Sequence, residues 1–402
     1  MARDAFIYDA VRTPRGRGRR EGSLYEVKPI HLLTTLLDAL EDRNRLDTAM
    51  VDDVIMGIVN PLGEQGSVLP KSAALLNGWN EKVSGLQLNR FCASGLEAIN
   101  IAAAKVSAGF ADVIVAGGVE SMSRVPMGSD GGPWAEDVET SFDTRYVPQG
   151  VSADLIATLD GYTREDVDGY ALRSQQRAAT ASNEGRFSRS LVPVRDRNGL
   201  PILSKDELIR FDADLAGLAR LKPSFEKVGG AGFDAVARGR YPEIGELRHV
   251  HTPGNSSGIA DGAAAVLIAS EEAGRTLGLA PRARVAAGTV LGSEPTIMLT
   301  GPAPVTTKLL KRIGLSPSDI DLYEVNEAFA AVVLRFLHEC EVDEAKVNVN
   351  GGSIALGHPL GATGAVLVGT LIDELERKGL NRGVVTLCAA SGMGIATMIE
   401  RV

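Results

Sequence analysis

Three residues in glycine-rich turns offer nucleophilic and acid/base chemistry. Cys92, in RFCASGLEA, stands between a short apolar run and a segment of helical length. His358 lies inside GGSIALGHPLGATG, and Cys388 separates the apolar run VVTL from a second glycine turn. A thiol at a helix N-terminus is favoured as thiolate, although a buried cysteine is often only a small hydrophobe. Two thiols and an imidazole in such turns together predict nucleophilic catalysis with a second acid or base.

The composition limits the kind of protein to which these three residues can belong. The 402 residues are 44% hydrophobic and 23% charged, which is typical of a soluble globular protein with a large core. The net charge of −9 argues against nucleic-acid binding. Three cysteines without CxxC spacing predict reduced thiols and a cytoplasmic location, and no zinc-like ligand spacing is present. No leader peptide or membrane span is expected from the N-terminal pattern or the lengths of the apolar runs.

The chain up to residue 123 alternates strand-like and helical segments. Buried strands are expected at Ala5–Pro14, Asp52–Pro61 and Ala111–Val119, and helices at Ile30–Arg43 and Leu69–Leu76. Such alternation predicts an α/β domain with a largely buried sheet. The N-terminal arginines Arg15, Arg17, Arg19 and Arg20 lie in a glycine-rich loop. They are expected to be mainly solvated, with phosphate binding as the alternative.

Residues 124–250 differ in character and carry most of the charge. We expect an inserted loop domain or lid there, with a solvated helix that begins at the N-cap candidate Thr163 and a hairpin over residues 192–207. Apolar alternation resumes at His251 and starts again from Arg282.

The second run resembles the first at one fixed offset. Asn60 ends a strand-like run as Asn326 does, 266 positions later (326 − 60), and the same offset places Cys92 on His358 and Gly95 on Gly361. Two segments that share one offset favour duplication over chance. The two halves are therefore expected to place equivalent turns face to face, one carrying Cys92 and the other His358.

Several long motifs together resemble the thiolase family. The motifs, which span nearly the whole chain, are NRFCASGLEA, GNSSGIADGAA, NEAFA, NGGSIALGHPLGATG and the terminal CxxxGMG. The resemblance implies duplicated α/β halves in α-β-α-β-α layers with an inserted loop domain. On that basis we predict an N-terminal half at 1–123 plus 251–273, a CoA-binding lid at 124–250 and a C-terminal half at 274–402.

The resemblance also implies roles. Cys92 becomes the acylated nucleophile, His358 takes its proton and keeps the thiolate charged as an imidazolium, and Cys388 serves as the second acid/base. Asn326 is expected to hold a water in one oxyanion hole. Backbone N–H groups of Cys92 and Ala390 are expected to form the other.

Substrate contacts follow from the same resemblance. Ser257 and Lys222 are the candidates for binding CoA. An acyl pocket is the possible site of Met127, Phe329 and Met298, for which core packing is an equal alternative. His249 and His251 are assigned no catalytic role, and loop hydrogen bonds are the favoured reading.

One segment departs from the family pattern. Thiolases usually have glycines soon after the second cysteine, where this chain reads Cys388-Ala389-Ala390-Ser391-Gly392. An alanine N–H can still serve an oxyanion unless the backbone there requires a positive φ. Altered turnover or acyl-chain preference is expected, and Ala390→Gly with Ser391→Gly should change the thiolysis kinetics.

Among thiolases the chain looks most like the degradative 3-ketoacyl-CoA thiolases that form the β subunit of a fatty acid oxidation complex. The implied substrates are CoA and 3-ketoacyl-CoA, with no cofactor or metal. The implied partners are a second copy of the chain and a hydratase/dehydrogenase α subunit. The alternatives are a biosynthetic acetoacetyl-CoA thiolase, a condensing ketosynthase, which Cys388 argues against, and a non-catalytic thiolase-like subunit.

Overall fold

The computed structural model of the chain describes residues 3–402. The strands are β1 (Ala5–Arg12), β2 (Gly16–Arg17), β3 (Asp53–Gly57), β4 (Ser84–Leu88), β5 (Val113–Ser121), β6 (Val194–Arg195), β7 (Pro201–Leu203), β8 (Ala260–Ser270), β9 (Ala283–Gly292), β10 (Leu322–Val325), β11 (Arg382–Ala389) and β12 (Met393–Arg401). The helices are α1 (Pro29–Asn44), α2 (Leu69–Leu76), α3 (Ser94–Ser107), α4 (Pro133–Glu136), α5 (Val138–Asp143), α6 (Gln149–Asp160), α7 (Arg164–Asn183), α8 (Leu215–Ala219), α9 (Glu226–Val228), α10 (Asp234–Arg240), α11 (Glu271–Thr276), α12 (Pro302–Ile313), α13 (Ala330–Cys340), α14 (Ser353–Leu356) and α15 (Thr363–Lys378).

The large sheet repeats one strand pattern. Its order is β10-β11-β12-β9-β1-β8-β5-β3-β4, and each half reads as one parallel pair followed by antiparallel neighbours. Thus β3-β5-β8-β1 corresponds to β10-β11-β12-β9, which confirms the duplicated α/β halves expected from the sequence. The counterpart of β4 is reduced to an isolated parallel bridge between Tyr323 and Val347.

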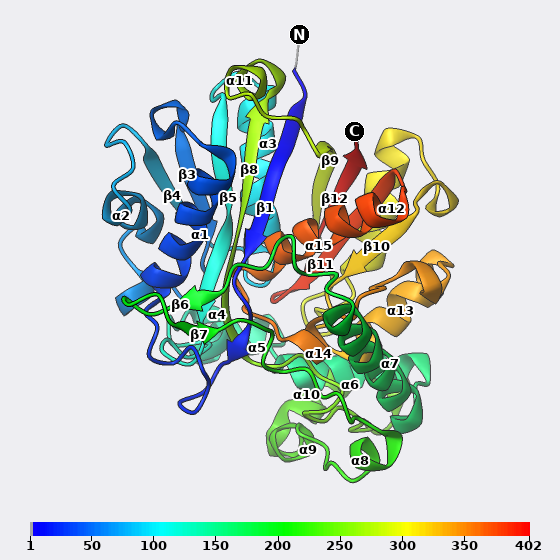
Figure 1. Cartoon of the computed structure of the whole chain (residues 1–402). Helices are drawn as coiled ribbons and strands as arrows, with labels where there is room; N and C mark the ends of the chain where they lie inside the picture. The colour runs from blue at the N-terminus through cyan, green and yellow to red at the C-terminus, as the bar shows by residue number, and fades with distance from the viewer. Residues whose placement is uncertain (1–2) are drawn as a thin grey trace.

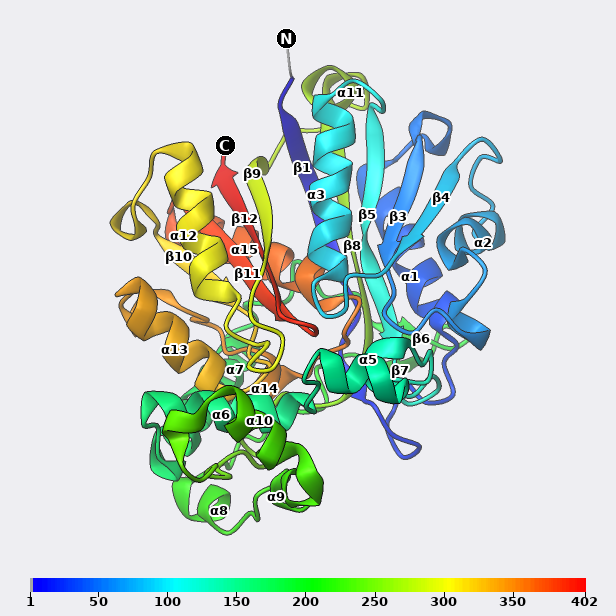
Figure 2. The same ribbon diagram turned by 180° about the vertical axis from the view of Figure 1, so that it is seen from behind.

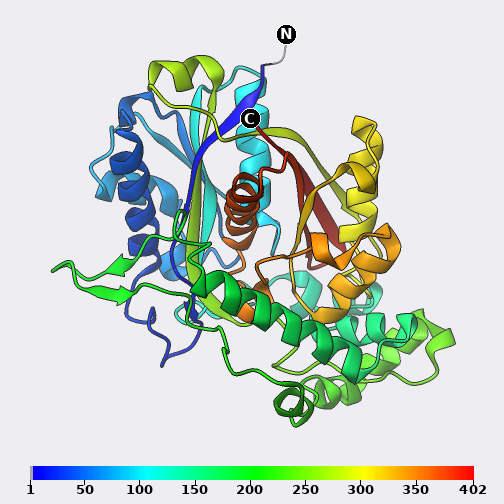
Figure 3. The same ribbon diagram turned by 45° about the vertical axis from the view of Figure 1, so that its right-hand side comes forward.

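Among residues 3–402, two residue pairs join the half-sheets by strand pairing. Phe6 pairs with Arg284 and Ile7 with Ala283, and beyond them the sheet opens. Helices α3 and α15 fill the space between the two half-sheets, α1 covers the outer face of the first, and α12 and α13 cover that of the second (Figures 1 and 3). The result is α-β-α-β-α layering, with α3 in view between the two half-sheets in Figure 2. The N-termini of α3 and α15 lie at the same end of the molecule, because a Cβ at Gly95 would meet the Gly361 carbonyl.

The central strands are buried and rich in small residues. All of β5 and β8 is buried, and alanine and glycine dominate where the two pair. A Cβ at Gly117 would lie 2.0 Å from the carbonyl oxygen of Ala264, so the close approach of these strands requires glycine there.

Helices α4–α10 lie at the end of the molecule below the large sheet (Figure 1). Thr163 forms the expected N-cap of α7 with a full capping box, and β6 and β7 form the expected hairpin. Helix α7 is not solvated all round, because one face, including Tyr170 and Ser174, is buried. The division at residues 1–123 plus 251–273, 124–250 and 274–402 stays a prediction, and its residues 1 and 2 lie outside the described chain.

Within residues 3–402, no helix combines the length and apolar character that crossing a bilayer requires.

Candidate active site

Cys92 lies in a tight turn between β4 and α3. The turn is locked by Ser94, whose hydroxyl donates to the Phe91 carbonyl at 2.6 Å and accepts from the Arg90 N–H at 2.8 Å. Phe91 takes a left-handed φ of 48° to make this turn. As a result Cys92 stands just before the first turn of α3 and is 5% exposed.

His358 lies in the equivalent turn before α15. Gly357, which precedes it, has a φ of 95° that a side chain would resist, and the His358 N–H donates to the Gly258 carbonyl at 2.8 Å. The side chain of His358 is 4% exposed.

The two turns pack directly against each other, as the duplication predicts. A Cβ at Gly95 would lie 2.5 Å from the Gly361 carbonyl oxygen, and one at Gly364 would lie 2.2 Å from the Leu96 nitrogen. Cys92 shares a small buried cluster with Leu360, two residues beyond His358. The glycines therefore allow the contact that brings the Cys92 and His358 turns together.

A chain of hydrogen bonds fixes the state of the His358 ring. The Thr363 hydroxyl donates to the Pro359 carbonyl at 2.8 Å, so it must accept from His358 Nδ1–H, which is 2.6 Å away. On the other side, the Ser353 hydroxyl donates to Asn326 Oδ1, which leaves Asn326 Nδ2 to donate to His358 Nε2 at 3.2 Å. His358 is thus assigned the tautomer with a proton on Nδ1 and a lone pair on Nε2.

Thr363 is expected to control this tautomer. Replacing it with valine removes the acceptor for Nδ1–H, so the ring can turn or change tautomer, and acylation should slow by about 10²-fold. Thr363→Ser keeps the hydroxyl and should retain most of the rate. Stopped-flow acylation measures the effect, and ¹⁵N-histidine NMR reports the tautomer directly. Equal rates for the valine and serine variants would contradict the assignment.

Cys388 is fully buried near the end of β11, next to the strand that leads to Asn326. The Asn326 N–H donates to the Thr386 carbonyl at 3.0 Å, which places Asn326 beside the Cys388 strand. In the hairpin that follows, Ser391 and Gly392 have φ of 62° and 72°, whereas Ala390 has no positive φ. The positive φ that an L-residue resists is therefore at Ser391, and the backbone of Ala390 is unstrained.

This hairpin yields a matched pair of variants. Ser391→Gly should stabilise the protein by about 1 kcal/mol, because a left-handed non-glycine residue carries roughly that strain. Ala390→Gly relieves nothing and adds backbone freedom to the unfolded chain, so it should be destabilising by about 0.5 kcal/mol. Thermal melts of the two variants test this, and shifts of Tm in the same direction would refute it.

Burial keeps the reactive groups neutral at rest. It raises the pKa of Cys92 to about 12, with Glu120 adding to the rise, and outweighs hydrogen bonds from the Cys92 N–H and Gln149. Burial, assisted by the nearby Arg15 cation, lowers the pKa of His358 to about 3. Desolvation therefore opposes a resting thiolate–imidazolium pair and outweighs the helix terminus, and the pair expected from the sequence stays a prediction. Cys388 is likewise held as a thiol, since burial and the nearby Cys92 raise its pKa.

Glu120 connects the loop after β3 with the His358 loop. This buried carboxylate at the end of β5 accepts from the N–H groups of Val59 and Asn60 in the first half and from that of Gly361 in the second, at 2.9, 3.2 and 2.9 Å. The Gln65 side chain completes the set at 2.8 Å. One carboxylate thereby holds the loop after β3 and the His358 loop in one register.

Of the two predicted CoA contacts, Ser257 lies next to Gly258, whose carbonyl accepts from the His358 N–H. The Ser257 N–H donates to the Ala328 carbonyl at 3.0 Å, and Ser257 is half-buried. Lys222 is exposed, and Leu221 next to it packs toward Gly254 of the same loop. This arrangement brings Lys222 and Ser257 to neighbouring segments.

The three residues considered for an acyl pocket differ in their burial. Phe329 and Met298 are buried in the core cluster of the second half, whereas Met127 is 57% exposed. His251 lies edge-on to Phe329, with a centroid distance of 5.4 Å. His249 and His251 both bind Asp154 of α6, at 2.7 and 2.8 Å, and His249 also binds Asp234 of α10. Their hydrogen bonds thus connect elements of the insertion instead of serving one loop.

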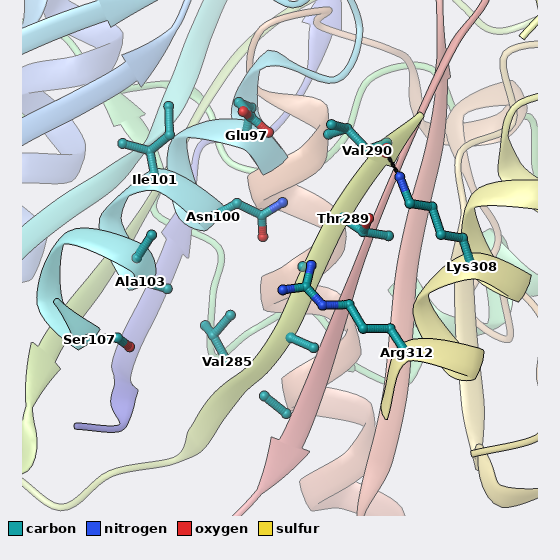
Figure 4. Close-up of a pocket in the computed structure, with 14 residues that line it drawn as sticks. Glu97, Asn100, Ile101, Ala103, Ser107, Val285, Thr289, Val290, Lys308 and Arg312 are labelled. Atoms are coloured by element: carbon teal, nitrogen blue, oxygen red, sulfur yellow. Dashed lines mark hydrogen bonds between the residues drawn. The ribbon is translucent and has the colours of Figure 1, made fainter. Parts of the chain in front are cut away.

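One cavity lies away from the candidate catalytic residues. It measures about 520 Å³ and lies between α3, β9 and α12, where Asn100 and Thr289 face Lys308 and Arg312 (Figure 4). None of the four candidate catalytic residues lines it. A second cavity of about 400 Å³ borders the Ser257 loop at Gly254 and Gly258. In the part of the chain that the structure describes, no group of acidic, histidine and cysteine side chains is arranged to hold a metal.

Several residues around His358 were not expected from the sequence. Thr363, Ser353 and Glu120 reach the site by hydrogen bonds, and Arg15 is buried beside the His358 loop although its neighbours Arg17 and Arg19 are exposed. Thr363 had a usable signal, since it follows His358 by five positions at the start of a helix. For Glu120 and Arg15 the partners are remote in sequence.

Known proteins match the chain over its whole length. The family model "Thiolase, N-terminal domain" matches residues 5–232 and "Thiolase, C-terminal domain" matches residues 279–401. The β-ketoadipyl-CoA thiolase of Pseudomonas aeruginosa is 43% identical, with 100% of both chains covered. The 3-ketoacyl-CoA thiolase of Cronobacter sakazakii is 38% identical over 98% of this chain and 99% of that protein. The structure of human mitochondrial 3-ketoacyl-CoA thiolase superimposes with a TM-score of 0.86 at 33% identity, covering 100% of this chain and 99% of that one.

Proposed function

This chain belongs to the thiolase family of acyltransferases, and we propose that it cleaves 3-ketoacyl-CoA with free CoA in fatty acid β-oxidation. The observation that carries the proposal is the packing of the Cys92 turn against the His358 loop, with the His358 proton held on Nδ1 and the lone pair on Nε2, which accepts from Asn326 at rest. A thiol nucleophile with a neutral imidazole base is what attack on a keto carbon requires.

The first half-reaction forms an acyl-cysteine. Cys92 Sγ attacks the 3-keto carbon of the substrate while its proton passes to His358 Nε2, so no free thiolate is needed in the resting enzyme. The bond between C2 and C3 then breaks, and its electron pair leaves as the enolate of acetyl-CoA. Cys388 supplies the proton that converts this enolate to acetyl-CoA.

The second half-reaction restores the enzyme. The Cys388 thiolate takes the proton of the incoming CoA thiol, and the CoA sulfur attacks the acyl carbon. Cys92 leaves and recovers its proton from the His358 imidazolium. We retain Asn326, through a bound water, and the N–H groups of Cys92 and Ala390 as the oxyanion donors. The reaction involves no net oxidation or reduction, which supports a reaction with CoA as substrate and no cofactor.

We further propose that CoA phosphates bind at the second cavity. Arg17, Arg19 and Arg210 line it, and neither Arg17 nor Arg210 has a carboxylate partner for its side chain among residues 3–402. Guanidinium groups suit phosphate, and the cavity borders the loop that carries Ser257. Arg17→Gln and Arg210→Gln should raise KM for CoA while kcat changes little, and Arg312→Gln in the other cavity is the matched control. An unchanged KM for CoA would show that these arginines do not bind CoA, and would leave the proposed contacts of Lys222 and Ser257 untouched.

One assay tests the activity and its subtype. Loss of 3-ketoacyl-CoA absorbance on adding CoA should be fastest with straight-chain substrates of β-oxidation. The first relative supports 3-ketoadipyl-CoA as a second candidate substrate, which the same panel compares directly. Preference for condensing acetyl-CoA would support a biosynthetic role. Absence of CoA-dependent cleavage with every substrate would refute thiolysis.

We also propose a homodimer. Strand β4 ends the large sheet and is only partly buried, and Leu86 on it and Leu76 of the neighbouring α2 are 38% and 57% exposed. Such an uncovered strand suits pairing with a second copy around a two-fold axis. Leu86→Lys should shift sedimentation toward a monomer, and unchanged sedimentation of a dimer would exclude this face.

Two further expectations remain proposals. A hydratase/dehydrogenase α subunit is the proposed hetero-partner, to be tested by pulldown from native lysate with identification by mass spectrometry. A cytoplasmic location is proposed because Cys92, Cys340 and Cys388 are all free thiols, which suits a reducing compartment.

A further inference from the structure

Arg15 is a buried cation that the acyl-transfer steps do not use. It lies in the bend between β1 and β2 and is 3% exposed, whereas Arg17, Arg19 and Arg20 of the same loop are exposed. A buried guanidinium is rare unless it is paired with an opposite charge and hydrogen-bonded.

The charge of Arg15 is only partly neutralised. Asp206 accepts from the Arg15 N–H at 2.9 Å and lies 3.4 Å from its Nε, but the same carboxylate also binds both terminal nitrogens of Arg12 at 2.8 Å. Although burial opposes it, the two guanidinium groups lower the pKa of Asp206 to about 2. One carboxylate shared by two cations leaves one net positive charge at this place.

Arg15 reaches the backbone on which His358 stands. Its Nη1 donates to the Gly357 carbonyl at 3.3 Å, while the N–H of the same peptide group, that of His358, donates to Gly258 at 2.8 Å. Both polar atoms of this one peptide are therefore held. The Arg15 stem and Pro359 also flank Gly262, with Cγ atoms 3.4 and 3.3 Å from the position of an added Cβ.

We propose that Arg15 is a positioning residue for acyl transfer, which fixes the peptide that carries His358 and so holds its imidazole where it can accept the Cys92 proton. The inference rests on the proposed role of His358 as the base for Cys92. The titratable groups around Arg15 are Asp206, Arg12 and Glu324, and burial raises the pKa of Glu324 well above its usual range, which favours its neutral form. Among these, Arg15 is the cation that acts on His358.

The same charge affects the later step. The imidazolium formed when Cys92 is acylated lies near a fixed cation, so it readily gives up its proton. Return of that proton to Cys92 completes the cycle, so the Arg15 charge opposes the first proton transfer and favours the return.

Arg15→Met is the decisive variant, with Arg15→Lys and Arg15→Gln to separate charge from hydrogen bonding. We expect Arg15→Met to slow acylation of Cys92 by about 10- to 100-fold, measured by intact mass in single-turnover reactions, with KM for CoA unchanged. Arg15→Lys should recover part of the rate. Exposed Arg20→Met is the control and should behave as the wild type.

NMR supplies a readout that a merely structural role would not move. With only five histidines in the chain, ¹³Cε1-histidine spectra can be assigned, and the His358 signal should titrate at a higher pH in Arg15→Met and Arg15→Gln than in the wild type. If Arg15→Met does not fold, Arg15→Lys and Arg15→Gln carry the test. Wild-type acylation and an unmoved His358 signal would overturn the proposal, whereas failure of the wild type to acylate would instead refute the proposed function.

Discussion

Replacing Cys92 with serine is expected to lower CoA-dependent cleavage by about 10⁴-fold, equivalent to about 5 kcal/mol of transition-state stabilisation. The replacement keeps the shape of the turn but substitutes a hydroxyl that is a far poorer nucleophile and leaving group than a thiol. The effect on chemistry should therefore be large, while the effect on stability should be small.

Intact-protein mass spectrometry measures this prediction most directly. The wild type should gain the mass of the shortened acyl group when mixed with 3-ketoacyl-CoA in the absence of free CoA, and Cys92→Ser should not. Cys340→Ala is the matched control, because Cys340 is also buried but ends α13, away from both turns. Acylation of Cys92→Ser at the wild-type rate would place the nucleophile elsewhere.

His358→Gln should slow acylation by about 10³-fold, within the range usual for loss of a general base. Because the Cys92 thiol is neutral at rest, removal of its proton acceptor leaves no route to the nucleophile near pH 7. Stopped-flow acylation gives the rate. Alkylation by iodoacetamide, which also needs the thiolate, should slow in parallel.

The exposed His338 at the end of α13 supplies the control, since His338→Gln removes an imidazole without touching the site. A result in which His358→Gln lowers cleavage but leaves acylation at the wild-type rate would assign His358 to the second half-reaction alone. Equal loss in both variants would indicate a general effect on stability.

Local sequence pattern was sufficient for much of this site. Glycines around Cys92 and His358 indicated turns of close approach, and the common offset indicated that Gly95 and Gly361 are equivalent. Both inferences depend on spacing within short segments, which the chain preserves on folding. The packing of Gly95 against Gly361 is their direct outcome.

The charge states of the site residues could not be predicted from local sequence. A helix N-terminus favours a thiolate at Cys92 when it is considered alone, but the burial that reverses this effect comes from all the surrounding layers. Asp206 and Arg15 lie 191 positions apart, so their pairing could not be predicted from a local sequence pattern. The register of the hairpin decides which residue takes a positive φ. The sequence alone raised this question for Ala390, whereas in the structure Ser391 has the positive φ.

The asymmetry between the two halves limits how large an assembly can become. Strand β4 offers one open edge of the large sheet, but at the opposite end β10 is followed only by the single-residue bridge from Tyr323 to Val347. A sheet with two equal open edges could add copies at both ends and grow without limit. Asn348 also hydrogen-bonds Tyr323 and Val325 along this β10 edge and so occupies it. Under the proposed pairing through β4, two chains that meet head to head would therefore use up their free edges, and growth would stop.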